Sequence, residues 1–264
     1  MDLQLKGKRA LVTGSTAGIG FAIAKALAAE GAAVVINGRA ADRVETALAQ
    51  LRAACPGAEV TGITADLATA EGCAALVAAC PDVDVLVNNL GIFDPKPFED
   101  IPDADWLRFF ETNVMSGVRL ARAYLGAMKR RNWGRIVFIS SESGLCPPAE
   151  MVHYGMTKAA QLSVARGLAE TCIGSGVTVN SVLPGPTRTE GVATFFGQLA
   201  RDQGVTVDEA ERAFFANARP TSIIKRLIDP AEVAAMVAYV CSPLSSATQG
   251  AALRVEGGVV RSMV

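Results

Sequence analysis

The chain has 264 residues, of which 50% are hydrophobic and 19% charged, and its formal net charge is -1. This composition argues against disorder, and the balanced charge favours neither nucleic acid nor an anionic membrane as a partner. No apolar run approaches the ~20 residues that span a bilayer, and the charged N-terminus lacks the apolar segment of a secretory signal. The six cysteines are scattered without a C-x-x-C pair, so we expect reduced thiols, no disulfide framework and no metal site. We therefore expect a cytoplasmic protein that folds as one domain over residues 1–264.

Short apolar runs alternate with longer helical patterns along the chain. The expected strands are 9–13, 33–37, 60–65, 83–88, 135–140, 177–183 and 252–256. The expected helices are 19–30, 42–54, 70–79, 103–131, 152–172 and 230–241. Strands that are apolar on both faces are typical of a parallel sheet covered by helices on both sides. The order predicts an α/β fold of the Rossmann type, a doubly wound parallel seven-stranded sheet in a three-layer α/β/α arrangement.

Residues 188–220 break the alternation, because they contain no expected strand. They carry four of the ten phenylalanines, Phe195, Phe196, Phe214 and Phe215, on expected short helices. These side chains could simply enlarge the core. Because long insertions often serve function and ligands bind at the carboxyl ends of parallel strands, we favour an apolar lid over a pocket there.

A glycine-rich turn, Thr13 to Gly20, joins the first expected strand to the first helix. Gly14 and Gly18 allow a tight turn and close approach of a phosphate, and Gly20 allows the helix to pack on the sheet. The amino end of the helix offers unpaired N–H groups to a pyrophosphate. An ordinary connection would also tolerate glycines, but the position in a βαβ unit favours nucleotide binding. The cofactor contacts expected from this turn are Gly14, Ser15, Thr16, Gly18, Ile19 and Gly20.

The spacing G-x-x-x-G-x-G resembles that of the short-chain dehydrogenase/reductase family, and the resemblance extends over nearly the whole chain. Asp66-Leu67 is similar to the adenine-contacting pair of the family. The segment Asn88-Asn89-Leu90-Gly91 is similar to its Asn-Asn-Ala-Gly motif, with Leu90 in place of alanine; it implies cofactor contacts from Asn88 and Gly91, although the asparagines could instead tie strand ends together. Val255-Glu256-Gly257-Gly258 is similar to a subunit-contact motif, which implies a homotetramer or homodimer.

The end of the second expected strand bears on the choice of cofactor. An acidic residue there would bind the ribose hydroxyls of NAD and repel the 2′-phosphate of NADP. This chain has Asn37-Gly38-Arg39 instead, with no carboxylate and a permanently charged phosphate partner. Arg39 could also be a solvated side chain at a helix start. We interpret Asn37 and Arg39 as cofactor contacts and expect NADP(H) in preference to NAD(H).

Tyr154 and Lys158 lie four residues apart on the expected helix 152–172, so they share one face. A free phenol has a pKa of about 10, and a nearby ammonium lowers it. Tyr154 could then exchange a proton with a carbonyl or alcohol oxygen, and Lys158 could bind the nicotinamide ribose. Such pairs are also common on helix surfaces.

The family resemblance strengthens the catalytic interpretation. The family has a substrate-orienting serine 13 residues before its Y-x-x-x-K motif, which implies Ser141, with Ser140 as the adjacent alternative. Asn113 matches a helix asparagine that holds a water in a proton relay through the lysine, although it could be a buried structural amide. The segment Pro184-Gly185-Pro186-Thr187-Arg188-Thr189 is similar to the loop that contacts the nicotinamide, which implies contacts from Pro184, Gly185, Thr187 and Thr189.

Two reactive residues near this constellation are not expected to be catalytic. His153 adjoins Tyr154, but adjacent helical residues point about 100° apart, so we expect a packing or substrate-loop role. Cys146 lies on the loop after Ser141 and could line the pocket, but no base is evident near it.

Together these features predict an oxidoreductase that transfers hydride reversibly between NADP(H) and a small-molecule ketone or secondary alcohol. The phenylalanines of 188–220 favour an apolar substrate, such as a 3-oxoacyl compound. Two alternatives stay open: a dinucleotide-binding sensor without turnover, and a lyase or epimerase that retains its cofactor.

Overall fold

The computed structural model describes residues 1–263. All seven expected strands are present and form one parallel sheet in the order β3-β2-β1-β4-β5-β6-β7. The strands are β1 (Arg9–Val12), β2 (Ala33–Gly38), β3 (Val60–Thr64), β4 (Val85–Asn88), β5 (Gly134–Ile139), β6 (Val177–Pro184) and β7 (Ala252–Val255). The prediction of a Rossmann-type, doubly wound sheet is confirmed.

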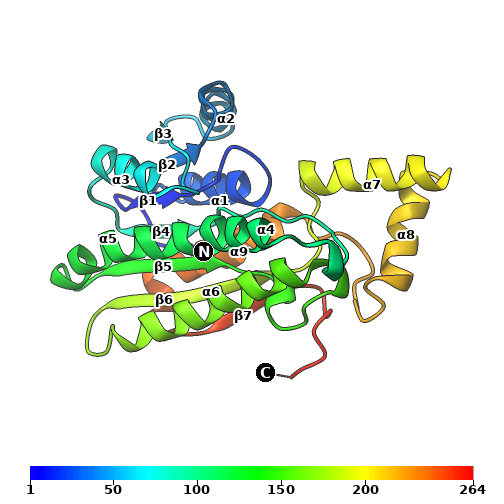
Figure 1. Ribbon diagram of the computed structural model, residues 1–264. Helices are drawn as coiled ribbons and strands as arrows, with labels where there is room; N and C mark the ends of the chain where they lie inside the picture. The colour runs from blue at the N-terminus through cyan, green and yellow to red at the C-terminus, as the bar shows by residue number, and fades with distance from the viewer. Residues whose placement is uncertain (264) are drawn as a thin grey trace.

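Helices cover both faces of this sheet (Figure 1). One apolar cluster packs the first face against α1 (Gly18–Ala29), α2 (Ala41–Ala54) and α9 (Pro230–Cys241). A second cluster packs the other face against α3 (Ala70–Ala79), α5 (Ser116–Arg130) and α6 (Val152–Glu170). The central strands between them are buried on both sides, as their mostly apolar sequences predict.

The strand order reverses between β1 and β4, which are neighbours in the sheet although far apart in sequence. The connections from these two strands leave in opposite directions, so a crevice opens between them at their carboxyl ends. The glycine-rich turn follows β1, and the segment from Asn89 to Gly91 follows β4. Both predicted cofactor loops therefore meet at this crevice.

The expected helix 103–131 is not a regular helix throughout. It consists of α4 (Asp103–Phe110), a π-helical turn (Glu111–Met115) and α5. The extra residue of a π turn changes the angular register of a helix, and such turns are frequent at functional sites. Here the turn carries Asn113, which is buried.

Residues 188–220 form two helices, α7 (Glu190–Gln203) and α8 (Val207–Asn217), which extend beyond the carboxyl edge of the sheet (Figure 1). Their interior is a small apolar cluster separate from the two main ones, centred on Phe196, Phe215 and Leu227. Thr189 caps α7, and Thr206 with Glu209 forms a capping box at α8. The segment is therefore a packed unit with its own core, and its helices are longer than the short ones expected.

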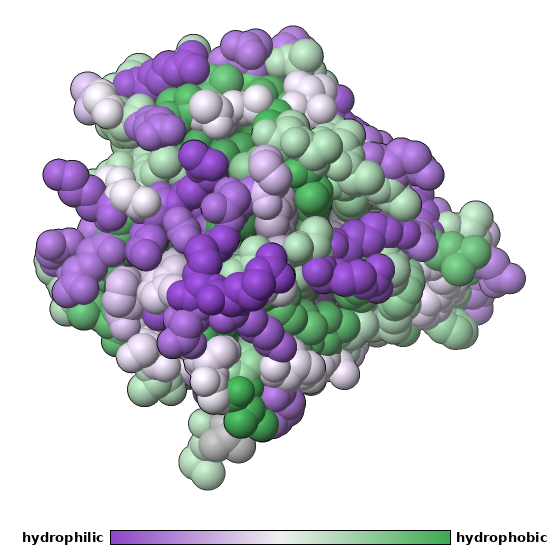
Figure 2. Space-filling model, turned by 90° about the vertical axis from the view of Figure 1, so that its left-hand side faces the viewer, coloured by the Kyte–Doolittle hydropathy of each residue, from purple (hydrophilic) through white to green (hydrophobic). Residues whose placement is uncertain are grey.

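The opposite edge of the sheet, where the strands begin, is hydrophilic at its centre (Figure 2). Arg131, which follows α5, forms ion pairs there with Asp82 and Asp84, which precede β4. None of the helices in residues 1–263 combines the length and apolarity needed to cross a membrane.

Candidate active site

A cavity of about 500 Å³ opens at the carboxyl edge of the sheet. Its walls come from the amino end of α1, the loop after β4, the loop after β5, α6, the loop after β6 and the two helices of residues 188–220. Eleven of the predicted site residues line it: Gly18, Ile19, Gly20, Gly91, Ser141, Tyr154, Lys158, Pro184, Gly185, Thr187 and Thr189. The others, which do not, are Gly14, Ser15, Thr16, Asn37, Arg39, Asp66, Leu67, Asn88 and Asn113.

The amino end of α1 is open toward this cavity. Ala17 precedes the helix and provides no side-chain cap for its N–H groups. Gly18 has a φ of +56°, and a Cβ there would lie 3.1 Å from Cγ2 of Thr189. An uncapped helix end in a glycine turn attracts anions such as phosphate. The residues present therefore fit the pyrophosphate of a dinucleotide.

Several predicted contacts instead hold the turn together. The Asn37 amide donates to the carbonyls of Ile63 and Ala65 at 3.1 Å each, and its Oδ1 accepts from the Gly14 N–H at 3.3 Å. The Ser15 hydroxyl donates to the Val12 carbonyl. These side chains fix the backbone between β1, β2 and β3. Asp66 and Leu67 lie at the end of β3, where Leu67 is buried and Asp66 is exposed.

The two asparagines after β4 occupy different environments. Asn89 lines the cavity and donates to the carbonyls of Thr13 and Gly14 at 2.9 Å each. Asn88 is buried, and neither polar atom of its amide has a hydrogen-bond partner within residues 1–263. Leu90 packs on Gly14, where a Cβ would lie 3.3 Å from Cδ1 of the leucine. Asn89 therefore ties the end of β4 to the turn after β1, whereas Asn88 does not.

Two arginines lie near the end of β2. Arg39 is exposed and has no ion-pair partner in the described part of the chain. Arg43, on α2, lines the cavity and pairs with Glu190 of α7 at 3.0 Å. A Cβ on Gly38 would lie 2.6 Å from Cγ2 of Thr16, which leaves no room for an acidic side chain there. Arg43 was not predicted, because it resembles an ordinary exposed residue in the first turns of a helix.

The two serines after β5 have distinct partners. The Ser140 hydroxyl donates to the main-chain carbonyl of Lys158 at 2.8 Å and so connects the strand to α6. Both serines line the cavity, and the Ser141 hydroxyl donates to Oε2 of the buried Glu142 at 2.5 Å. Because the Ser140 hydroxyl is bonded to the main chain of α6, this geometry favours Ser141 as the residue that could contact a substrate.

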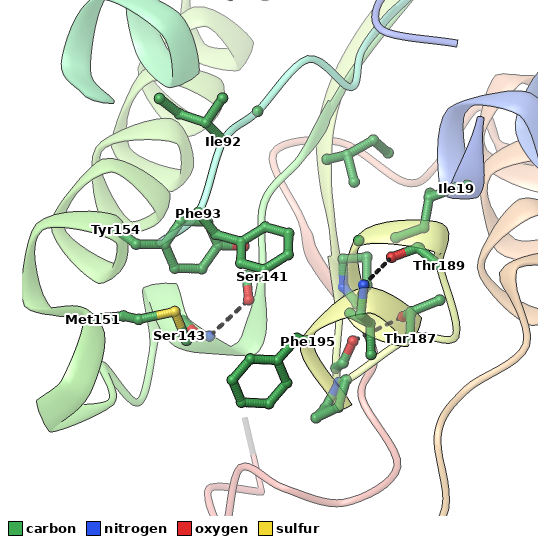
Figure 3. A pocket seen from close by; sticks show the side chains of 18 of the residues that line it. Ile19, Ile92, Phe93, Ser141, Ser143, Met151, Tyr154, Thr187, Thr189 and Phe195 are labelled. Atoms are coloured by element: carbon green, nitrogen blue, oxygen red, sulfur yellow. Dashed lines mark hydrogen bonds between the residues drawn. The ribbon is translucent and has the colours of Figure 1, made fainter. Parts of the chain in front are cut away.

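Tyr154 and Lys158 both project from α6 into the cavity, as predicted from their spacing (Figure 3 shows Tyr154 beside Phe93 and Ser141). The Lys158 Nζ lies 5.5 Å from the centre of the Tyr154 ring. Burial lowers the pKa of Lys158 to about 8, opposed by the charge of Glu142. Burial also raises the pKa of Tyr154 above its ordinary value, and the Glu142 charge raises it further, while Ser141 opposes this. The net shift for Tyr154 is thus opposite to the lowering expected from the ammonium alone.

Lys158 has a hydrogen-bond partner that the sequence did not reveal. Lys158 Nζ donates to the Ile139 carbonyl at 3.0 Å and to Oε1 of Gln161 at 3.2 Å, and the Gln161 amide donates to the main-chain carbonyl of Asn113 at 2.6 Å. A buried glutamine therefore connects the lysine to the π-helical turn. The Asn113 side chain bonds to both main-chain polar groups of Ile92 and to Thr157.

His153 and Cys146 lie outside the cavity wall. His153 is fully buried, 4.1 Å from the Phe109 ring centre and 6.0 Å from that of Trp106. Neither ring nitrogen has a hydrogen-bond partner within residues 1–263, and burial lowers its pKa. Cys146 is exposed and does not line the cavity.

The loop after β6 closes the cavity on the side of α7. The Thr187 hydroxyl donates to the Gly185 carbonyl at 2.8 Å, and Thr187 pairs with Ile228 in an isolated bridge. Figure 3 shows Thr187 and Thr189 on the same side of the cavity as Ile19 of α1, facing Tyr154 and Ser141. This placement brings the predicted nicotinamide loop beside the glycine turn.

The chain is similar to known proteins along its whole length. The family model described as short chain dehydrogenase matches residues 8–199. The uncharacterized oxidoreductase YvaG of Bacillus subtilis is 54% identical, in an alignment that covers 100% of both chains. D-beta-hydroxybutyrate dehydrogenase of Cupriavidus necator is 32% identical, in an alignment that covers 97% of this chain and 99% of the relative. L-Sorbose reductase from Gluconobacter frateurii, solved with NADPH and L-sorbose, has a TM-score of 0.93 and 31% identity over 100% of both chains.

Fold, crevice and similarity together define a nicotinamide-dependent oxidoreductase that acts on CH–OH or C=O groups. The chain belongs to the short-chain dehydrogenase/reductase family.

Proposed function

We propose that the protein reduces ketones with NADPH and oxidises the corresponding secondary alcohols with NADP⁺. The observation that carries this proposal is the presence of Ser141, Tyr154 and Lys158 in one cavity with the uncapped amino end of α1. The cofactor, when bound, supplies or accepts the hydride at the substrate carbon. L-Sorbose reductase, whose fold is similar to that of the chain, was solved with NADPH.

The residues of the chain handle the proton. In reduction, the Tyr154 hydroxyl donates its proton to the carbonyl oxygen as that oxygen gains negative charge, and the Ser141 hydroxyl donates a hydrogen bond to the same oxygen. The raised pKa of Tyr154 keeps this proton available at neutral pH. One hydride and one proton convert C=O into CH–OH, and Tyr154 then takes a proton from solvent. The charge of Lys158 stabilises the phenolate formed in between.

Cofactor recognition would divide between the two ends of the crevice. The N–H groups at the start of α1 and the turn of Gly14, Ser15, Thr16 and Gly18 would hold the pyrophosphate. Arg39, with Arg43 beside it, would bind the 2′-phosphate. We also propose that residues 188–220 act as a lid, because Phe195, Phe196 and Phe214 line the cavity.

We further propose that the protein is a homotetramer or homodimer. Its mass in solution would test this proposal.

A fluorescence titration tests the cofactor preference. The wild type should bind NADPH more tightly than NADH, and Arg39→Ala should weaken NADPH binding by at least ~10-fold because a charge-assisted phosphate contact is lost. Arg130→Ala, an exposed arginine on α5 at the opposite edge of the sheet, is the control. Equal affinities for the two cofactors in the wild type would refute the preference.

A further inference from the structure

A cluster of three charged side chains lines the cavity wall beside Ser141. Glu142, Glu150 and Arg219 all contribute to this wall. Glu142 and Arg219 are buried, with 5% and 9% of their surfaces exposed, whereas Glu150 is exposed. Charged side chains are rarely buried in an otherwise apolar pocket without a function or a partner.

Arg219 lies between the two carboxylates. Its Nη1 lies 3.1 Å from Oε1 of Glu150, and its Nε lies 3.7 Å from Oε1 of Glu142. Arg219 is near Oε1 of both carboxylates, so Oε2 of Glu142 is left to accept hydrogen bonds from other groups. Next to this oxygen the wall favours a substrate group that donates hydrogen bonds over a carboxylate.

The second oxygen of Glu142 lies next to Ser141. Its Oε2 accepts a hydrogen bond from the Ser141 hydroxyl at 2.5 Å, and this hydroxyl would donate to the substrate carbonyl. Once Ser141 turns to the substrate, Oε2 loses this hydrogen bond inside a buried site, which is unfavourable unless another donor replaces it. Because Oε2 is so close to the Ser141 hydroxyl, a hydroxyl on the carbon next to a carbonyl bound there would lie within its reach.

From this geometry we propose that Glu142 determines specificity by accepting a hydrogen bond from a hydroxyl group adjacent to the reacting carbonyl. The inference rests on the proposed function and names its substrate class: 2-hydroxy ketones, and vicinal diols in the oxidative direction. The remaining walls include Phe93, Met151 and Phe195, which point into the same space (Figure 3). An apolar group on the other side of the carbonyl fits these side chains better than a second charge.

A matched set of aryl ketones tests this proposal. The set is 2-hydroxyacetophenone, acetophenone, which lacks only the hydroxyl, and benzoylformate, which carries a carboxylate instead. The quantity measured is the kcat/KM for each ketone at saturating NADPH. We expect the wild type to prefer the hydroxy ketone over acetophenone by at least ~10-fold, because a site built for a hydroxyl rejects the analogue without it.

Substitutions at Glu142 test whether this residue causes the preference for the hydroxy ketone. Glu142→Leu should reduce the ratio of the two kcat/KM values by at least ~10-fold, and Glu142→Gln, which keeps the shape and one acceptor oxygen, should reduce it less. Glu170→Gln, which removes an exposed ion pair with Arg166 on α6 outside the cavity, is the matched control and should keep the wild-type ratio. NADPH titration verifies that each variant is folded.

The possible failures are distinguishable. If the wild type reduces acetophenone as well as the hydroxy ketone, or prefers benzoylformate, or if both Glu142 variants keep the wild-type ratio, the role of Glu142 is refuted while the reductase function stands. If Glu142→Leu does not bind NADPH, the kcat/KM ratios of the wild type and of the isosteric Glu142→Gln variant decide whether Glu142 sets the preference. If the wild type consumes no NADPH with any ketone of a broader panel, the proposed function itself fails.

Discussion

Tyr154 is the residue on which the proposed chemistry depends most directly. Tyr154→Phe removes the proton donor and leaves the ring, so NADPH affinity should stay near that of the wild type while kcat for ketone reduction falls by ~100-fold or more. Stopped-flow single-turnover measurements of NADPH oxidation would check this, with Tyr239→Phe, an exposed tyrosine on α9, as the control. Full activity in Tyr154→Phe would remove the mechanism.

The lowered pKa of Lys158 predicts how the activity depends on pH. Its pKa is lowered to about 8, so the ammonium is present below that pH and is lost above it. In the proposed mechanism the charged lysine would stabilise the phenolate and bind the ribose, so kcat/KM for NADPH should be flat through neutral pH and fall above about pH 8. A profile from pH 6 to 10 with saturating ketone would show this, since kcat/KM reports groups of the free enzyme. A profile that rises through this range would contradict it.

Gln161 should shift that profile because its carbonyl oxygen is an acceptor for the ammonium. Gln161→Leu removes the acceptor and makes the charged form less favourable, so the pKa of Lys158 falls further and the decline moves to lower pH. Gln50→Leu, the same change on the exposed side of α2, should keep the wild-type midpoint. A merely structural role of Gln161 would lower activity equally at every pH.

At the scale of elements, the boundaries of the strands follow from the sequence because most are largely apolar runs between turn residues. The π-helical turn could not be predicted, since Glu111 to Met115 have an ordinary helical composition and the contacts of α4 and of the turn with α6 form only in the folded chain. The pairing of Glu142 with Arg219 was missed for the same reason, because contacts between distant segments decide it. Glu142 and Arg219 meet only through the fold, whereas Tyr154 and Lys158 were found because one helix brings them together.

The helical unit α7–α8 should open independently of the sheet, because its apolar cluster is separate from the other two. Phe215 is buried in that cluster and does not line the cavity. Phe215→Ala should destabilise the unit by ~3–5 kcal/mol, so amide exchange in α7 and α8 should accelerate while β5 and β6 keep their protection. Phe98→Ala, at an exposed phenylalanine, is the control, and equal acceleration throughout would contradict an independent unit.

At the scale of the whole molecule, His153 should make stability depend on pH. It is the single histidine, it is buried, and its pKa is lowered in the folded state. The unfolded chain therefore binds more protons below about pH 6.5, and the free energy of unfolding should fall there with a slope approaching ~1.4 kcal/mol per pH unit. Urea titrations at pH 7.5 and 5.5 would measure this loss. His153→Leu should reduce it, and an unchanged loss would show that other groups are responsible.

The π turn also limits how the chain can change in length. Phe109, before the turn, packs against His153 of α6. Leu120 and Tyr124, after the turn, are buried in the apolar cluster between the sheet and α3, α5 and α6. Removing one amino acid between 111 and 115 would convert the turn into regular α-helix and keep Leu120 and Tyr124 on the buried face, whereas adding one would rotate the later half by about 100°. Loops at the molecule's edge can gain or lose residues during evolution, whereas this stretch tolerates a change of length in one direction only.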